Sequence, residues 1–172
     1  MHTQQEGNED DIIFRKPKTA DGKYLWELAR ASKTLDLNSP YHYLILCRHF
    51  HHTCMIAEQK GVVVGFVTAY IPPEFQDTLF IWQVAVAEQA RGKKLGLNLI
   101  TRLFNQVNQH TITRIASTIT PSNTASVRLF TAVARELGAS HEFKEEFFGA
   151  KDFGPNAHEP EMLFRIGPVT PA

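Results

Sequence analysis

Apolar residues recur along the chain at two different spacings, which distinguishes predicted strands from predicted helices. The segment 78–88 is apolar at nearly every position, as is typical of a strand buried on both faces of a sheet. The segment that starts at Leu95 instead has apolar residues every three or four positions, which predicts an amphipathic helix. Its stripe consists of Leu99, Ile100, Leu103, Phe104 and Val107. A central strand is therefore expected to lead directly into a helix.

Similar patterns extend over the rest of the chain. The expected elements are strand 12–17, helices 20–35 and 40–50, two strands within 54–72, strand 78–88, a helix from 95, strand 114–121, helix 122–138, and strands 141–147 and 161–167. Ser39-Pro40 is a typical helix start, Lys60-Gly61 a typical hairpin turn, and Gly138 a typical helix end. The order βααβββαβαββ predicts an α/β fold with a mixed, mostly antiparallel sheet flanked by helices.

Length and charge exclude several classes of protein. The 172 residues suit one domain, expected at 12–168 with flexible tails at 1–11 and 169–172. The 18 basic and 18 acidic residues cancel, so nucleic acid is not an expected partner. No apolar run reaches the roughly 18–20 residues of a membrane span, and the polar start does not resemble a secretory signal. We therefore expect a cytoplasmic protein without a membrane partner, with Cys47 and Cys54 as reduced core residues.

The loop between the central strand and the next helix carries candidate chemistry. Arg91, Gly92, Lys93 and Lys94 occupy this junction, and the helix begins at Leu95-Gly96. Free backbone N–H groups, the positive end of a helix and mobile cations together favour a bound pyrophosphate. The chain lacks the GxxxxGK motif of nucleoside triphosphatases and the GxGxxG motif of dinucleotide folds.

The loop resembles the acyl-coenzyme-A loop of the GNAT N-acetyltransferases, whose pattern is Arg or Gln, two residues, Gly, one residue, then Gly or Ala. Arg91 and Gly96 match its ends, whereas Lys94 replaces the middle glycine; a register shifted to start at Gln89 matches the first glycine but loses the last. The element order also resembles that family's fold. The resemblance implies acetyl-CoA as co-substrate, bound by Val84, Val86, Arg91, Gly92, Lys93, Lys94, Leu95, Gly96 and Asn123.

Two positions in the segment 122–138 bear on this resemblance, one in its favour and one against it. Asn123 matches the family's coenzyme-contacting asparagine, although a simple helix cap would explain it as well. Seven residues later many family members carry a tyrosine that protonates the leaving thiolate, and here the residue is Phe130, which has no proton to give. Either another group serves as the acid, or the thiolate leaves without help, because the thiol resembles that of a free cysteine, with a pKa of about 8.5.

Acceptor-site candidates lie in three stretches. By period-two alternation Trp82 shares a strand face with Phe80, Val84 and Val86, which would place it near the acceptor; a core aromatic is the alternative. Asp36 and Tyr41 lie in the break between the first two helices, where Asp36 could also be a helix terminator. His158 and Glu161 lie where the last loop enters the final strand, and Glu161 could be an exposed edge charge.

Four stretches narrow the resemblance. "LDLNSPYHYLILCRHF", "FIWQVAV", "ARGKKLGLN" and "GPNAHEPEML" are similar to the diaminobutyrate acetyltransferases of ectoine biosynthesis, over nearly the whole chain. This implies acetylation of the γ-amine of L-2,4-diaminobutyrate to the N-γ-acetyl product, the precursor of the osmolyte ectoine made under osmotic stress. It also implies a cytoplasmic homodimer.

The substrate's groups then suggest roles for these residues. Asp36 and Glu161 could bind the α-ammonium group, because discrimination between two amines needs fixed polar partners. Tyr41, Thr118 and His158 could hold the carboxylate or relay a proton, and Trp82 could wall the pocket. The expected reaction is direct attack of the neutral amine, with Trp82, Val84, Glu161 and His158 at the reacting centre. Backbone N–H groups along Val84–Val86 would hold the oxyanion if that strand splays or bulges.

Other functions remain open on the sequence alone. "HFHHTC" contains His49, His51, His52 and Cys54, but its spacing matches no structural zinc pattern, so no metal is expected. His49 is expected at a helix C-terminus. A non-catalytic acyl-CoA sensor would explain the missing tyrosine and glycine. An acetyltransferase for another small diamine or amino acid, such as ornithine or lysine, is the nearest enzymatic alternative, and acetylation of protein tails fits the polar pocket residues less well.

Overall fold

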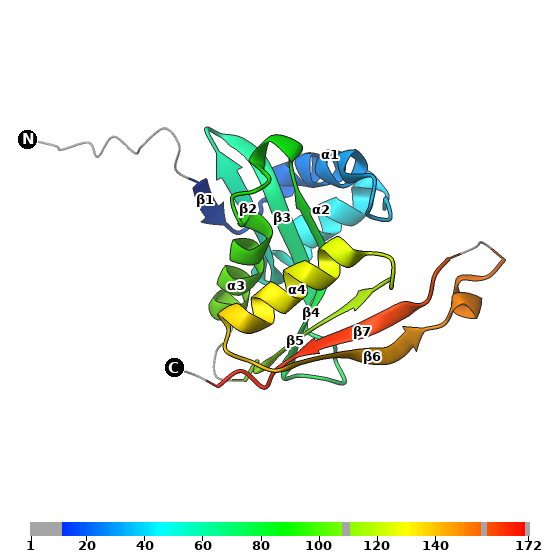
Figure 1. Cartoon of the computed structure of the whole chain (residues 1–172). Coiled ribbons are helices and arrows are strands. Elements are labelled where there is room, and N and C mark those ends of the chain that lie inside the picture. Colours follow the sequence, from blue (N-terminus) through cyan, green and yellow to red (C-terminus); the bar gives the residue numbers. More distant parts are fainter. Residues whose placement is uncertain (1–11, 108–110, 156–157, 171–172) are drawn as a thin grey trace, which may run out of the picture.

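The computed structural model describes residues 12–107, 111–155 and 158–170, and its elements follow the predicted order (Figure 1). The strands are β1 (Ile12–Arg15), β2 (Cys54–Gln59), β3 (Val62–Tyr70), β4 (Thr78–Val86), β5 (Arg114–Ile119), β6 (His141–Phe148) and β7 (Glu161–Ile166). The helices are α1 (Gly22–Ser32), α2 (Pro40–His49), α3 (Leu95–Val107) and α4 (Thr124–Glu136). Short 3-10 turns at Thr19–Asp21, His51–Thr53, Glu88–Ala90 and Ala150–Phe153 were not predicted.

The strands form one sheet in the order β1-β2-β3-β4-β5-β7-β6. Five neighbouring pairs are antiparallel, and β4 pairs with β5 in parallel. The expectation of a mixed, mostly antiparallel sheet with a central strand 78–88 is confirmed. Helices α1 and α2 pack on one face and α3 and α4 on the other, so the core has two parts separated by the sheet (Figure 1).

Local sequence signals explain how several elements begin and end. The Ser39 hydroxyl accepts a hydrogen bond from the N–H of His42 (3.4 Å), and Pro40 opens α2 as predicted. Lys60 and Gly61 both have positive φ (52° and 76°), as a tight hairpin turn requires. Gly138 ends α4 with φ 61°, and Ala139 N–H donates to Ala134 O at 2.9 Å, which completes a Schellman motif.

Strands β4 and β5 separate part of the way along their length. They pair only over Thr78–Phe80 and Arg114–Ala116, and beyond that no ladder joins them. At the point of separation the Ser117 hydroxyl donates to Ile81 O at 2.9 Å. The splayed part of β4 therefore has a free edge, which forms one wall of a cleft in the middle of the sheet.

A bulge in β4 corrects the predicted strand face of Trp82. Thr68 of β3 opposes Gln83 and Ala69 opposes Ile81, so Trp82 is an extra residue between the two pairs. The bulge reverses the alternation: Ile81 and Val84 both face the core under α3 and α4, whereas Ala85 packs under α1 and α2. Trp82 lies on the same side as Phe80, since both contact Tyr70, but Val84 and Val86 lie on the opposite side.

The ends of the described part bear on the predicted tails. Residues 1–11 and 171–172 lie outside the described residues. Val169, expected in the C-terminal tail, donates its backbone N–H to Thr113 O at 2.8 Å and packs against the core. Among the helices of the described ranges, none has the length and apolar character needed to cross a membrane.

Candidate functional site

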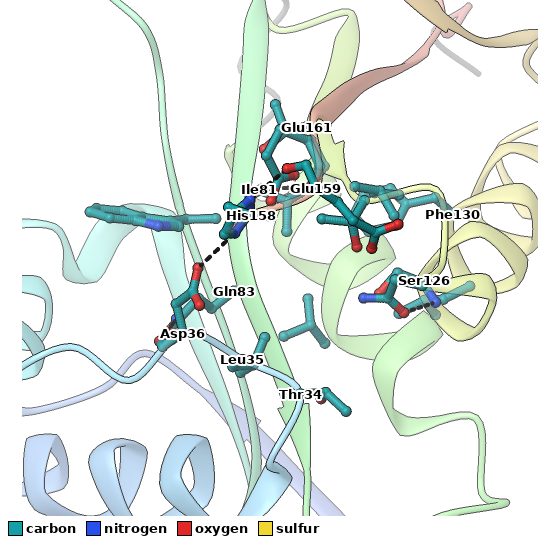
Figure 2. A pocket seen from close by; sticks show the side chains of 18 residues that line it. Thr34, Leu35, Asp36, Ile81, Gln83, Ser126, Phe130, His158, Glu159 and Glu161 are labelled. Atoms are coloured by element: carbon teal, nitrogen blue, oxygen red, sulfur yellow. Dashed lines mark hydrogen bonds and ion pairs between the residues drawn. The ribbon is translucent and has the colours of Figure 1, made fainter. Parts of the chain in front are cut away.

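The cleft between β4 and β5 opens into a cavity of about 490 Å³. One side is formed by the loop after α1 and by the bulged part of β4, the other by β5, the first turns of α4 and the start of β7 (Figure 2). The predicted residues that line it are Asp36, Trp82, Val84, Thr118, Asn123, His158 and Glu161. Segments more than 100 residues apart in the sequence thus meet at the point where the sheet splits.

The backbone of the splayed strand presents hydrogen-bond donors to this cleft. Ala87 donates its N–H to Val64 O of β3 at 2.8 Å. Successive N–H groups of a strand point to opposite edges, so those of Val86 and Val84 face the side that β5 has left. The strand both splays and bulges, which was the condition set for an oxyanion site. These two N–H groups are free to receive a developing negative charge.

A buried polar bridge holds the loop that carries Asp36. The Tyr43 hydroxyl of α2 donates to Gln83 Oε1 at 2.9 Å, and Gln83 Nε2 donates to the backbone carbonyl of Asp36 at 2.8 Å. Tyr43 is fully buried and Gln83 nearly so. Burial raises the pKa of Tyr43, so its hydroxyl stays protonated and serves as a donor. The bridge therefore fixes Asp36 relative to β4.

Three ionisable side chains meet at the mouth of the cavity. His158 Nε2 lies 3.8 Å from Asp36 Oδ2, and His158 Nδ1 lies 2.5 Å from Glu159 O. The His158 ring stacks on Phe153, with ring centroids 3.9 Å apart. Figure 2 shows Asp36, His158 and Glu161 in a row, with Ser126 and Phe130 of α4 to the right of them. The cluster carries more acid than base, which suits a cationic ligand.

Glu161 is the half-buried member of this cluster. Its Oε2 is buried and has no hydrogen-bond partner among the described residues. Desolvation raises the pKa of this carboxyl above its usual value, and the nearby Asp36 and Glu159 charges act in the same direction; Thr118 and His158 oppose the shift. A desolvated carboxylate with a free oxygen is suited to bind an ammonium group or to accept its proton.

Trp82 and Tyr41 were both assigned to the acceptor pocket, but of the two only Trp82 lines the cavity. Trp82 lines the cavity and its indole stands edge-on to His42 of α2, with centroids 4.6 Å apart. Its side chain is 47% exposed, so it is not the core aromatic of the alternative interpretation. Tyr41 is 69% exposed in the first turn of α2 and does not line the cavity. The structure therefore does not bring Tyr41 together with the other predicted residues.

A second cavity of about 490 Å³ lies over the start of α3. Of the predicted coenzyme contacts, it is lined by Val86, Arg91, Gly92, Lys94, Leu95 and Gly96, while Lys93 is exposed and does not line it. Asn98 N–H bonds to Lys94 O at 2.9 Å and is the first intrahelical bond. The N–H groups before it, in the first turn of α3, have no partner within the helix and can bind an anion.

Two residues of this loop have left-handed backbones. Gly92 has φ 79° and Lys94 has φ 56°. Lys94 stands where the family pattern has a glycine, and it adopts the conformation that glycine permits more easily. The loop thus keeps its shape despite the substitution, and it adds a cation beside the free N–H groups.

The two cavities are neighbours along β4. Leu129 of α4 lines both, and Val84 and Val86 are two residues apart on the same edge. A Cβ atom on Gly96 would lie 3.4 Å from Leu129 and 3.8 Å from Val84. Both are ordinary van der Waals distances, so α3, α4 and β4 lie close together at this point.

The start of α4 shows the cap that was weighed against a coenzyme contact. Asn123 Oδ1 accepts the N–H of Ser126 at 3.1 Å, so Asn123 caps the helix. The same residue lines the first cavity, and its Nδ2 makes no hydrogen bond to another described residue. Phe130 also lines this cavity, and its ring packs on Phe164 with centroids 5.7 Å apart. No hydroxyl is present at that position.

The histidine-rich stretch lies elsewhere in the fold. His49 ends α2 as predicted, and the rings of His51 and His52 lie next to each other in the following turn, with centroids 4.0 Å apart and planes tilted by 39°. Cys54 is buried in β2 and, like Cys47, is a free thiol, as expected. Burial raises the pKa of both thiols, to about 11 and about 12 respectively, which keeps them unreactive. In the described part of the chain, no three ligand-type side chains are grouped to hold a metal.

Sequence reasoning missed several lining residues, among them Gln83, Ser126 and Arg135. Gln83 has a signal, since it is the one polar residue inside an apolar central stretch. Ser126 shares a helical face with Asn123, but a serine near a helix start is too common to stand out. Arg135 lines the second cavity from the last turn of α4, where a basic residue also suits the helix dipole.

Comparisons with known proteins agree with this geometry. A family model for the acetyltransferase (GNAT) family matches residues 22–134. The chain is 44% identical to the L-2,4-diaminobutyric acid acetyltransferase of Marinococcus halophilus over 172 residues, covering 98% of this chain and 96% of the relative. It is 46% identical to the enzyme of that name from Streptomyces avermitilis over 163 residues, covering 94% and 90%.

Solved structures give the same picture. The diaminobutyrate acetyltransferase of Paenibacillus lautus, solved with its substrate L-2,4-diaminobutyric acid and coenzyme A, superimposes with a TM-score of 0.88 at 41% identity, covering 95% of this chain and 98% of that one. A putative acetyltransferase of Salmonella typhimurium, solved with acetyl-CoA, gives a TM-score of 0.70 at 18% identity over 94% of this chain and 96% of that chain, which shows a shared fold.

Proposed function

The chain belongs to the acetyltransferase (GNAT) family, and on that premise we propose that it transfers the acetyl group of acetyl-CoA to the γ-amine of L-2,4-diaminobutyrate. The product is N-γ-acetyl-2,4-diaminobutyrate, the precursor of ectoine. One observation carries the proposal: a cavity suited to phosphates and an acidic cavity share Leu129, and between them the splayed part of β4 presents the N–H groups of Val84 and Val86.

In this proposal the coenzyme occupies the second cavity. Its pyrophosphate lies at the first turn of α3, where the free N–H groups, Arg91 and Lys94 offer positive charge. The pantetheine arm then follows β4 past Val86 towards Val84, with Asn123 at the far end. This path puts the thioester carbonyl at the Val84 N–H, which faces the gap between β4 and β5.

The acceptor, diaminobutyrate, occupies the first cavity in this proposal. Asp36 and Glu161 receive the α-ammonium group, since both carboxylates reach the mouth of the cavity. Thr118 and His158 are the lining groups that can hydrogen-bond the substrate's carboxylate. Trp82 forms the wall on the α2 side and limits the length of the chain that fits. The γ-amine then points inward to the thioester.

The reaction needs a neutral amine. An alkyl amine is about three pKa units above neutrality, so deprotonation costs about 4 kcal/mol. Glu161 accepts this proton through water, because its desolvated carboxylate has a raised pKa and, besides the oxygen that binds the α-ammonium group, a second oxygen, Oε2, without a partner among the described residues. The amine attacks the carbonyl carbon, the oxygen becomes negative, and the Val84 N–H stabilises it.

We also propose that the protein acts as a cytoplasmic homodimer. The support is the family resemblance and strand β6, an exposed edge strand that carries Phe147 and Phe148 on its surface. Long edge strands with exposed apolar side chains are commonly covered by a partner. Light scattering after size-exclusion chromatography tests this, and a monomeric mass at assay concentration would contradict it.

The proposed reaction is tested by thiol release from acetyl-CoA with diaminobutyrate, ornithine, lysine, a polyamine and no amine. We expect rapid release with diaminobutyrate and little with the others. Rapid release with a different amine would keep the reaction and discard the substrate. Coenzyme binding without release from any amine would identify a sensor instead. Asp36→Ala and Glu161→Ala should each lower kcat/KM for diaminobutyrate, and unchanged values would remove them from the site.

A further inference from the structure

The α4 wall of the first cavity has a single free hydroxyl. Asn123, Ser126 and Phe130 all line the cavity, and their spacing of three and four residues places them on one face of the helix. Asn123 Oδ1 is engaged in the cap, and Phe130 has no polar atom. Ser126 is therefore the residue of this wall that can offer an O–H group to a ligand.

Two neighbouring serine hydroxyls already donate a hydrogen bond to another group, and the threonine hydroxyls of this region lie away from the α4 wall. Ser117 donates to Ile81 O at 2.9 Å, and Ser122 donates to Glu159. Thr118 lies beside Glu161 and opposes the rise in its pKa. Thr34 and Thr120 also line the cavity, but they lie on the loops after α1 and β5, away from the α4 wall.

Ser126 also differs from two threonines in the middle of helices α3 and α4. Thr101 of α3 and Thr131 of α4 donate to the carbonyl four residues earlier, Leu97 O at 3.0 Å and Val127 O at 2.8 Å. Ser126 is in the first turn of α4, so the residue four positions earlier lies outside the helix. Its hydroxyl makes no hydrogen bond within the described residues, and it is thus available.

The position of Ser126 matches the leaving group of the proposed reaction. Leu129 and Val84 both line this cavity and both lie within 4 Å of where a Cβ atom of Gly96 would be, so this face of α4 lies near the part of β4 whose N–H holds the carbonyl oxygen. Ser126 is one turn closer to the acceptor cavity than Leu129. We propose that the Ser126 hydroxyl donates a hydrogen bond to the coenzyme sulfur as the thioester bond breaks, an inference that rests on the proposed acetyl transfer.

The bond changes define what this hydrogen bond does. The amine nitrogen forms a bond to the carbonyl carbon, and the C=O π pair moves onto oxygen. The nitrogen, which gave its first proton to Glu161 before the attack, loses its second proton to solvent water, the oxygen pair re-forms C=O, and the C–S pair leaves on sulfur as a thiolate. Ser126 keeps its proton and shares it with the sulfur, which stabilises the negative charge. The N-terminal end of α4 adds a favourable dipole at the same place.

The test is single-turnover thiol release with diaminobutyrate at saturating acetyl-CoA. Ser126→Ala should slow release about tenfold to a hundredfold, the range expected for a hydrogen bond to a charged group, with both KM values nearly unchanged. Ser126→Thr keeps the hydroxyl and should retain most of the rate. Thr131→Ala removes a hydroxyl of the same helix that is already engaged, and it should match the wild type.

Rescue of the rate by a second substitution would distinguish the proposed role of Ser126 from a loss of folding. Long helical side chains point towards the helix N-terminus and cover the turn before them, so the Phe130→Tyr hydroxyl should reach the region of Ser126. Adding it to Ser126→Ala should restore at least part of the rate. An unchanged rate in Ser126→Ala, or a loss that neither Ser126→Thr nor Phe130→Tyr reduces, would overturn the inference. Absence of release in the wild type would instead refute the proposed function.

Discussion

Lys94 shows how a departure from a family pattern can leave the structure intact. The sequence alone suggests a lost glycine at this position and therefore a weakened loop. The backbone of Lys94 nevertheless has φ 56°, which a residue with a Cβ atom adopts at a cost of about 1–2 kcal/mol. The loop thus keeps its conformation at the cost of backbone strain at Lys94, and the Lys94 side chain supplies a positive charge near the proposed pyrophosphate.

Lys94→Gly separates these two effects. We expect a free energy of unfolding higher by about 0.5–1 kcal/mol, because relief of the strain exceeds the extra entropy of glycine in the unfolded chain. The KM for acetyl-CoA should rise at the same time, since a cation is lost. Denaturant melts and steady-state kinetics measure the two. Lys93→Gly is the matched control, because Lys93 has no positive φ and should gain no stability.

Glu161 should combine a benefit to activity with a cost to stability. Its pKa is raised in the folded state, so ionisation disfavours folding as the pH rises through that pKa. Glu161→Gln should therefore be more stable than the wild type at neutral pH. The gain should vanish below the ordinary glutamate pKa of 4.5, where both states carry a proton.

The same variant should have little acetyl transfer activity, because an amide cannot accept a proton. Thermal melts at pH 4 and pH 7.5 with parallel rate assays test the pair of effects. Lower stability than the wild type at pH 7.5 would contradict the assignment of desolvation as the main cause of the raised pKa.

At the scale of elements, the order and type of every helix and strand follow from local pattern, since caps, turns and apolar spacing act within a few residues. The bulge at Trp82 does not, because it depends on how β4 pairs with β3. Period-two alternation across an unrecognised bulge assigns Val84 and Val86 to the wrong side relative to Trp82. The four 3-10 turns were missed because three or four residues carry too little pattern.

The Gln83 bridge gives a prediction for the element that carries Asp36. Gln83→Leu keeps an apolar strand but removes both hydrogen bonds, including the one in which Gln83 accepts from the buried Tyr43 hydroxyl. We expect a loss of about 1–3 kcal/mol of stability and a higher KM for diaminobutyrate, with the KM for acetyl-CoA nearly unchanged. Gln76→Leu, in an exposed turn, is the control for loss of an amide. A raised KM for acetyl-CoA alone would contradict this role.

The loop before α3 gives the complementary prediction. Replacement of both Arg91 and Lys94 by alanine should raise the KM for acetyl-CoA and leave the KM for diaminobutyrate nearly unchanged. The ionic-strength dependence of the coenzyme KM should also weaken, because salt screens the removed charges. Steady-state kinetics at low and high salt provide the measurement. An unchanged coenzyme KM would show that these side chains point to solvent.

At the scale of the whole molecule, the proposed site is made of segments that the sequence keeps far apart. Asp36, Val84, Thr118 and Glu161 meet because β4 and β5 separate between them. No local pattern encodes that separation, and the sequence identified these residues only through resemblance to a family. Tyr41 was assigned by the same resemblance, but in this structure it lies outside the cavity. The hydrogen bonds that support the site, through Gln83 and Tyr43, required the structure.

The most direct test of the account is competition in one vessel. Diaminobutyrate, ornithine, lysine and a polyamine at equal concentration compete for a limiting amount of acetyl-CoA, and NMR identifies each acetylated nitrogen. We predict that the acetyl group is found on diaminobutyrate, at the γ-nitrogen, because the two carboxylates at the mouth of the cavity hold the α-ammonium group away from the thioester. Acetylation of the α-nitrogen, or preferential use of another amine, would contradict the proposed arrangement of the site.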